Sequence, residues 1–262
     1  MPVQQKHARH PGDTPAQVAA RKRFLDAGFY APIRDTALTL LQPHLPPRPS
    51  LLDAGCGEGY YAKSIAAEMR DSRAEPAGRN PAGRSSEREE DSPSELLQKT
   101  ESPLADSAVI ALDLSKDAVK CASRGGNDVC WLVSDLSRIP LKDNSIDCIL
   151  NIFTPANYGE FQRILTDEGR ILKVIPDEDH LRELRQQIIN KEYSNQQVIR
   201  HFEKHFRLIE QIPLKKTMSL RPEQLGCLFD MTPLLFHVDR EERKKLTIAE
   251  ITVDACLLVG KK

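Results

Sequence analysis

A short apolar strand that runs directly into a glycine-rich loop constrains this chain more than any other feature. Residues 51–61 read LLDAGCGEGYY. Gly55 and Gly57 permit a tight turn and leave room for a ligand close to the backbone. The helix expected from Glu58 to Met69 would point its first backbone N–H groups toward the same ligand. This order of strand, loop and helix predicts a binding crevice at the end of the first strand of a parallel sheet.

The residues within this loop indicate which ligand the crevice binds. The glycine spacing is G-x-G-x-G and Asp53 lies two residues before the first glycine, whereas dinucleotide loops usually read G-x-G-x-x-G. A carboxylate at Asp53 would repel a pyrophosphate and attract an ammonium group. We therefore interpret the loop as a site for S-adenosylmethionine rather than for a nicotinamide cofactor. The cofactor-binding residues expected here are Asp53, Gly55, Gly57, Glu58 and Gly59.

Two further acids follow predicted strands. Asp113 ends the strand VIALD, where an acid accepts hydrogen bonds from ribose hydroxyls in this architecture. Asp135 follows the strand expected at residues 129–134 and is predicted to accept from the adenine amine. A helix cap for Asp113 and an ordinary loop acid for Asp135 are the simpler alternatives.

The distance between the first two acids is unusual. Asp113 lies 60 positions after Asp53, whereas the ribose-binding acid is expected about 20 residues beyond the glycine loop. The stretch 70–106 is dominated by Pro, Ser, Arg and Glu, and its large apolar residues are Leu96, Leu97 and Leu104. Such a segment buries too little to offset its ordering entropy. We predict a disordered insertion at 70–106, and removing it restores the expected spacing.

The remaining pattern predicts an α/β fold of the Rossmann-like class I methyltransferase type. Strands alternate with helices between residues 50 and 175, which is typical of a mostly parallel, doubly wound sheet. Residues 180–206 are expected to be helical, and the late strands 207–212, 215–219 and 249–259 predict an antiparallel strand at the end. We expect residues 1–49 to form an N-terminal arm and helical segment covering the cofactor pocket, and residues 50–262 to form the methyltransferase domain.

Bulk properties exclude several classes of protein. The net charge is −1, so any RNA contact requires a local basic patch. No apolar run approaches the roughly 18 residues of a membrane span, and the six cysteines form no CxxC pair. We expect a cytoplasmic protein with no metal site and no membrane or DNA partner. The basic residues considered for RNA phosphates are Arg21, Lys22, Arg23, Lys215, Lys216 and Arg221.

Several motifs together resemble the bacterial 23S rRNA (guanine-N1)-methyltransferases, nearly end to end apart from 70–106. They are HPGDT (10–14), ARKRFLDAGFYAPIRD (20–35), LDAGCGEGYY (52–61), LDLSKDAVKCA (112–122), NIFTP (151–155), HLREL (180–184) and LRPEQLGCLFDMTP (220–233). The family typically begins with a small zinc-binding module, and this sequence starts at what resembles the junction after it.

The resemblance implies methyl transfer from S-adenosylmethionine to N1 of a guanine in a ribosomal RNA hairpin. It also implies cofactor contacts from Tyr30, from the stretch Gly57–Tyr60, which adds Tyr60 to the loop residues, and from His180. Phe153 is interpreted either as a platform for a base or as a core residue, and Asn151 as a contact to one edge of the base. The sequence identifies no catalytic base and leaves a homodimer open.

Two competing functions stay open at this stage. One is a methyltransferase that acts on another RNA or on a small molecule. The other is a cofactor-binding relic without activity, which the intact set of Asp53, Gly55, Gly57, Asp113 and Asp135 disfavours.

Overall fold

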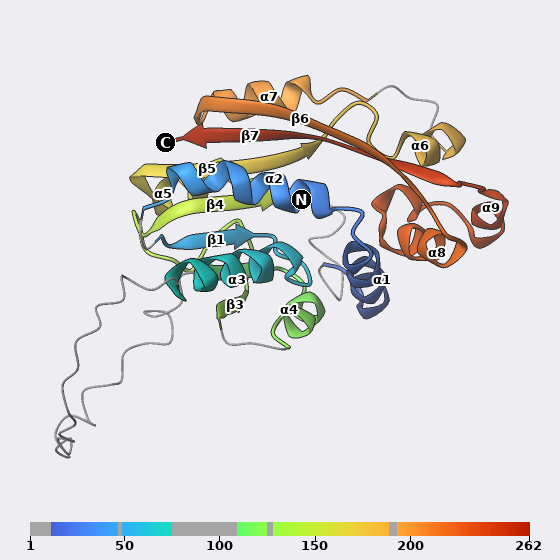
Figure 1. Ribbon diagram of the computed structural model, residues 1–262, viewed down its shortest axis with the longest axis horizontal. Coiled ribbons are helices and arrows are strands. Elements are labelled where there is room, and N and C mark those ends of the chain that lie inside the picture. The colour runs from blue at the N-terminus through green and yellow to red at the C-terminus, as the bar shows by residue number, and fades with distance from the viewer. Residues whose placement is uncertain (1–11, 47–48, 75–108, 125–127, 189–192) are drawn as a thin grey trace, which may run out of the picture.

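A seven-stranded sheet forms the centre of the molecule (Figure 1). The computed structural model describes residues 12–46, 49–74, 109–124, 128–188 and 193–262. The strand order is β3-β2-β1-β4-β5-β7-β6. The strands are β1 (Leu51–Ala54), β2 (Val109–Asp113), β3 (Val129–Val133), β4 (Ile146–Ile152), β5 (Leu165–Pro176), β6 (Arg207–Ser219) and β7 (Glu250–Lys261). Strands β1 to β5 pair in parallel, whereas β7 is antiparallel to both β5 and β6.

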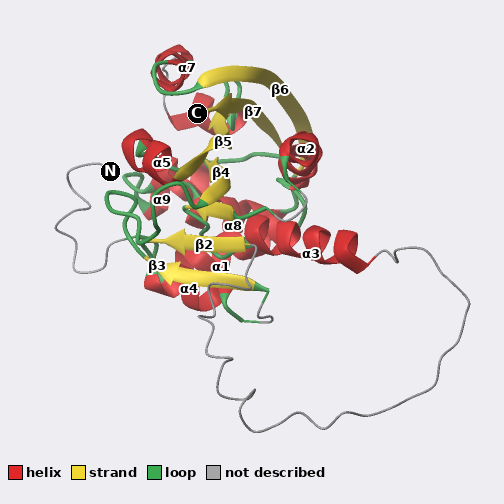
Figure 2. Ribbon diagram, turned by 90° about the vertical axis from the view of Figure 1, so that its left-hand side faces the viewer, coloured by secondary structure: helices red, strands yellow, loops and turns green. Residues whose placement is uncertain are grey.

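Helices cover both faces of the sheet (Figure 2). The helices are α1 (Pro15–Asp26), α2 (Ala31–Leu41), α3 (Tyr60–Ala74), α4 (Lys116–Ala122), α5 (Tyr158–Ile164), α6 (Arg182–Ile188), α7 (Gln196–Glu203), α8 (Pro222–Met231) and α9 (Arg240–Lys245). Successive strand residues enter opposite cores, as the two-residue period of a strand requires. Leu51 belongs to the core cluster that includes residues of α1, α2 and α3, while Leu52 belongs to the cluster that includes residues of α5 and α7. This two-sided burial explains why the central strands are almost wholly apolar.

The N-terminal segment is held at the carboxyl ends of the parallel strands. Thr14 and Gln17 form a reciprocal capping box at the start of α1, and Pro15 occupies its first turn. The hydroxyl of Ser115, at the start of α4, donates to the carbonyl of Asp13 at 2.9 Å. Helix α1 then packs against α8. The segment therefore connects the loop after β2 with the C-terminal part of the chain.

The predicted fold class is confirmed, with differences in particular elements. The predicted break between two late strands is wrong, because β6 continues through Pro213, opposite Cys256 of β7. Strand β6 lies at the edge of the sheet, where a residue without an N–H group is tolerated. The expected helical stretch 180–206 contains two helices, α6 and α7.

The boundary predicted for the insertion is also too early. Helix α3 continues to Ala74, and residues 75–106 of the predicted insertion lie outside the described part of the chain. None of the helices in the described ranges is both long enough and apolar enough to cross a membrane.

The packing under α5 gives a direct test of the core. Phe161 is fully buried, whereas Phe236 is 39% exposed. We expect Phe161→Ala to lower the free energy of unfolding by about 3–5 kcal/mol, because it removes an aromatic ring and leaves a cavity. The matched change Phe236→Ala should alter it by less than about 0.5 kcal/mol. Urea unfolding monitored by circular dichroism measures both, and equal effects would contradict the described packing.

Candidate active site

A cavity of about 950 Å³ opens where the parallel strands end. Its walls come from the glycine loop, from the loops after β2, β3 and β4, and from segments at α1, α6, α7 and α8. A crevice at the carboxyl ends of the strands is where open α/β sheets bind their ligands. The sequence therefore predicted the correct end of the sheet.

Seven of the ten predicted site residues line this cavity. They are Tyr30, Gly55, Gly57, Glu58, Asp113, Asp135 and His180. Asp53 is 1% exposed and is not part of the lining. Gly59 has a packing role, since a Cβ atom there would lie 2.5 Å from the Trp131 ring.

Tyr60 is not among the residues that line the cavity, and its contact with the cofactor stays a prediction. Its hydroxyl accepts a hydrogen bond from Arg34 of α2 at 3.2 Å. Tyr61, the next residue, lines the cavity instead. Neighbouring residues at the start of a helix point in different directions, so a motif alone does not identify which tyrosine faces the ligand.

Hydrogen bonds to the end of β2 hold the glycine loop in position. The N–H groups of Gly55 and Cys56 both donate to the carbonyl of Leu112 at 2.9 Å. Asp113 accepts from the N–H of Gly57 at 3.0 Å through Oδ2 and from the N–H of Ser115 at 2.8 Å through Oδ1. Asp113 therefore orders two loops while it faces the cavity. Ser115 rather than Asp113 is the N-cap residue of α4, and the ribose contact of Asp113 stays a prediction.

Gly55 requires the absence of a side chain. Its φ is +92°, and a Cβ atom would lie 2.4 Å from Cγ2 of Thr154. Thr154 follows β4, so the loops after β1 and β4 are in direct contact. No other residue type fits here without moving one of the two loops.

An acidic cluster surrounds the glycine loop. Burial raises the pKa of Asp53 to about 7, and the neighbouring carboxylates of Asp113 and Glu58 add to the shift. Burial also raises the pKa of Glu58 to about 7 and raises the pKa of Asp113. Within the described part of the chain, Oδ2 of Asp53 and the hydroxyl of Tyr61 are buried without a hydrogen-bond partner. Buried polar atoms are rarely left unpaired, so these two atoms indicate a place for polar groups of a ligand.

Arg21 brings a positive charge into this acidic region. Its guanidinium group forms an ion pair with Asp13, and both residues line the cavity. A guanidinium nitrogen of Arg21 lies 3.7 Å from the Cβ position of Gly57. The sequence had grouped Arg21 with candidate RNA contacts, but the structure places it beside the glycine loop.

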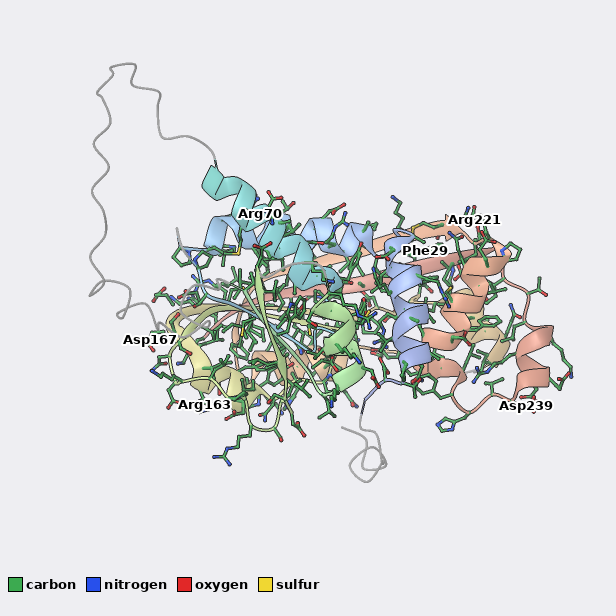
Figure 3. All side chains as sticks on the ribbon, turned by 90° about the horizontal axis from the view of Figure 1, so that it is seen from below. Phe29, Arg70, Arg163, Asp167, Arg221 and Asp239 are labelled. Atoms are coloured by element: carbon green, nitrogen blue, oxygen red, sulfur yellow. The ribbon has the colours of Figure 1, made fainter. Side chains whose placement is uncertain are left out.

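Three of the other candidate RNA contacts form ion pairs with carboxylates. Lys22 pairs with Asp26, Lys215 with Asp179 and Arg221 with Glu223. Arg221 lies at the opposite end of the molecule from Arg163 and Asp167 (Figure 3).

An aromatic wall stands opposite the acidic cluster. Nδ1 of His180 lies 2.8 Å from the carbonyl of Asp254, which can only accept, so we place the proton on Nδ1. Nε2 then accepts from the hydroxyl of Tyr30 at 3.3 Å. Burial lowers the pKa of His180 to about 4, so the ring is neutral at neutral pH. The Phe153 ring centroid lies 5.5 Å from that of Tyr30 and 5.2 Å from that of His180.

Asn151 acts beneath the cavity rather than in it. It is fully buried, and its amide donates to the carbonyl of Ala54 at 3.1 Å and to the hydroxyl of Thr154 at 2.7 Å. Its oxygen accepts from Nζ of Lys173 at 2.6 Å, and burial lowers the pKa of this lysine to about 8. The expected contact of Asn151 with a base is therefore wrong. The lysine within the apolar strand sequence ILKVI was the available signal for this buried network.

Comparisons with known proteins agree with this geometry. A family model described as a methyltransferase domain matches residues 93–174. A Bacillus subtilis protein, named as a proposed 23S rRNA (guanine-N1)-methyltransferase, is 29% identical over 253 residues, which cover 93% of this chain and 78% of that protein. A Streptomyces fradiae protein, named 23S rRNA (guanine(748)-N1)-methyltransferase, is 28% identical over 247 residues, which cover 91% and 75% of the two chains.

Solved structures share the fold at lower identity. The YcgJ protein of Bacillus subtilis aligns with a TM-score of 0.51 and 16% identity, covering 87% of this chain and 98% of that one. A SAM-dependent methyltransferase of Aquifex aeolicus aligns with a TM-score of 0.50 and 17% identity, covering 77% and 93%.

The fold and these matches define a Rossmann-like class I methyltransferase that uses S-adenosylmethionine. Within this class, the resemblance to bacterial 23S rRNA (guanine-N1)-methyltransferases is confirmed. The residues present fit the cofactor. The backbone of Gly57 is open to the cavity, and the unpaired Tyr61 hydroxyl and the carboxylates of Glu58 and Asp113 line it, which suits a ligand that carries ammonium and sulfonium charges.

The raised pKa of Asp53 predicts a stability that depends on pH. The folded protein holds this proton up to about pH 7, whereas the unfolded chain releases it near the ordinary value of 3.8, so folding loses stability as the pH rises between them. We expect Asp53→Asn to raise the free energy of unfolding by on the order of 2 kcal/mol at about pH 8 and to change it little at about pH 4. Urea unfolding of both proteins at both pH values measures this. A variant less stable than the wild type at the higher pH would contradict the raised pKa of this buried carboxylate.

Proposed function

We propose that this chain methylates N1 of a guanine in 23S ribosomal RNA, in a hairpin of that RNA. The observation that carries the proposal is the gathering of motifs from distant parts of the sequence around one cavity, in a chain similar to rRNA methyltransferases over about nine tenths of its length. An rRNA substrate would also place the protein in the cytoplasm. Every residue used in the proposal comes from one chain, so it requires no homodimer.

The cofactor half of the cavity is formed by the glycine loop and the acids around it. We assign the ribose hydroxyls to Asp113, the adenine amine to Asp135, and the ammonium group to the buried pair Asp53 and Glu58. Each carboxylate accepts hydrogen bonds or attracts positive charge, which suits these parts of the ligand. Bound in this way, the cofactor supplies an electrophilic methyl group on a sulfonium.

Arg21 is the partner that we assign to the carboxylate of the methionine moiety. Among the described residues that line the cavity around the loop, Arg21 carries a positive charge and the other charged residues are Asp13, Glu58 and Asp113. A guanidinium group binds a carboxylate through two parallel hydrogen bonds. Its pairing with Asp13 also connects the N-terminal segment to the cofactor, which supports the predicted covering role of residues 1–49.

The residues after β4 would orient the guanine. In the reaction N1 attacks the methyl carbon, the carbon–sulfur bond breaks, and the N1 proton leaves to a base or to water. The leaving group is already good, so positioning and exclusion of water carry most of the catalysis. The buried network of Asn151 and Lys173 holds the turn at residues 153–155, which places the Phe153 ring on the cavity wall. His180 is a weak base because its pKa is low and Tyr30 donates to its Nε2.

The carboxylate assignment can be tested with a matched pair of ligands. We expect Arg21→Met to weaken S-adenosylmethionine binding by about 10- to 100-fold, because one charge-assisted pair is lost. Binding of decarboxylated S-adenosylmethionine should be equal in the variant and the wild type. Arg23→Met, an exposed change on the same helix, is the control. Calorimetric titrations measure the affinity of all three proteins for both ligands. An equal loss of affinity for the two ligands in Arg21→Met would contradict the assignment.

The proposed reaction is tested with unmethylated ribosomal RNA. We expect the purified protein to transfer labelled methyl from S-adenosylmethionine to 23S rRNA from a strain that lacks this gene. Primer extension should stop at one guanine, because N1-methylation blocks base pairing. The same assay with transfer RNA and with metabolites examines the alternative substrates. Tight cofactor binding with no transfer to any RNA would overturn the proposal.

A further inference from the structure

The cavity is divided by charge. Its cofactor half is lined by the carboxylates of Asp13, Glu58, Asp113 and Asp135. Beyond Phe153 the lining changes, and the ionisable and aromatic residues there are Tyr158, Arg185, Tyr193, His201 and His205. Among the described residues that line this second half, none carries a carboxylate. A positively charged cofactor and a negatively charged substrate require this separation.

His201, on α7, and His205, two residues beyond the end of α7, form the edge of the second half. His201 and His205 are one helical turn apart, and their ring centroids are separated by 5.0 Å. Both rings lie 5.1 Å from the ring of Tyr158, at the start of α5. Within the described part of the chain, neither imidazole makes a hydrogen bond through its ring nitrogens. These nitrogens are therefore available to a ligand, next to an aromatic ring that is already fixed.

Two buried phenylalanine rings fix the orientation of α7 on the sheet. Phe202 is fully buried, and Phe206, just beyond the helix, is 2% exposed. A Cβ atom on Gly260 of β7 would lie 2.6 Å from the Phe202 ring, so the helix sits directly on the sheet. Burial of these two rings fixes which face of α7 is turned outward.

The outward face of α7 carries a second pair of basic residues. Arg200 and Lys204 are exposed and also one turn apart, so they form a row beside the two histidines. Neither forms an ion pair with a residue in the described ranges. A row of cations beside a row of aromatic rings is the arrangement that binds single-stranded nucleic acid, with phosphates on the former and bases on the latter.

We infer that α7 is the RNA-docking element of this protein, and that Tyr158, His201 and His205 receive the target nucleotide at the mouth of the cavity. Arg200 and Lys204 hold the phosphates that flank it. The inference rests on the proposed RNA substrate and names residues that the sequence motifs did not include. The occupant is RNA with the target base turned out of its stack, because a base must leave a helix to reach a cavity of this kind.

RNA binding and methyl transfer test this inference separately. We expect His201→Ala combined with His205→Ala to lower kcat/KM on 23S rRNA by about 10- to 100-fold, since contacts to one nucleotide are lost. Calorimetric binding of S-adenosylmethionine should stay unchanged in this variant, because the cofactor half is untouched. His237→Ala is the matched control: His237 is exposed and is not part of the cavity lining.

Arg200→Ala combined with Lys204→Ala tests the phosphate contacts. A plot of log binding constant against log salt for an rRNA fragment should lose about 0.7 in slope for each contact removed. Lys120→Ala combined with Lys142→Ala, which changes two exposed lysines away from the cavity, should leave the slope unchanged.

The outcomes distinguish this inference from the proposed function. RNA binding that depends on α7 but yields no methylation would support the docking element and overturn the proposed reaction. Methylation with unchanged kinetics and salt dependence in the α7 variants would overturn the docking element alone. A wild-type protein that binds no RNA would overturn both.

Discussion

The two hydrogen bonds that Asp113 accepts support most of the site. One oxygen of its carboxylate holds the glycine loop through Gly57, and the other holds the start of α4 through Ser115. Ser115 in turn binds the carbonyl of Asp13, so the N-terminal segment depends on the same carboxylate. The carboxyl ends of β1 and β2 are thereby joined to the segment that contributes Arg21 and Tyr30 to the cavity. A single half-buried acid thus positions three parts of the chain around one cavity.

Gathering acids in this way is electrostatically unfavourable unless positive charge is close to them. Asp53 and Glu58 are both nearly inaccessible, and burial raises the pKa of each to about 7. Arg21 offsets part of this charge but is itself paired with Asp13. A ligand with ammonium and sulfonium groups supplies the missing positive charge. The second half of the cavity has basic and aromatic groups instead, and the two halves meet at Phe153.

The sequence was most informative where a local pattern has one physical meaning. The glycine loop, the acids at the ends of two strands and the alternation of strands with helices predicted the fold class and the end of the sheet that binds ligand. Prediction from the sequence failed where contacts between distant parts of the chain determine the position of a residue. Nothing local shows that Tyr61 rather than Tyr60 faces the cavity, or that Arg21 turns inward. The break predicted between residues 212 and 215 is absent because β6 lies at the edge of the sheet, and that edge position is a property of the whole sheet.

The central claim is that buried, protonated carboxyl groups ionise to bind a cationic cofactor, and proton release on binding tests it most directly. Calorimetric titration of S-adenosylmethionine at about pH 6, in two buffers that differ in ionisation enthalpy, measures the number of protons exchanged. The raised pKa values of Asp53 and Glu58 predict a net release of protons at this pH. Binding without proton exchange, or with net uptake, would contradict the account.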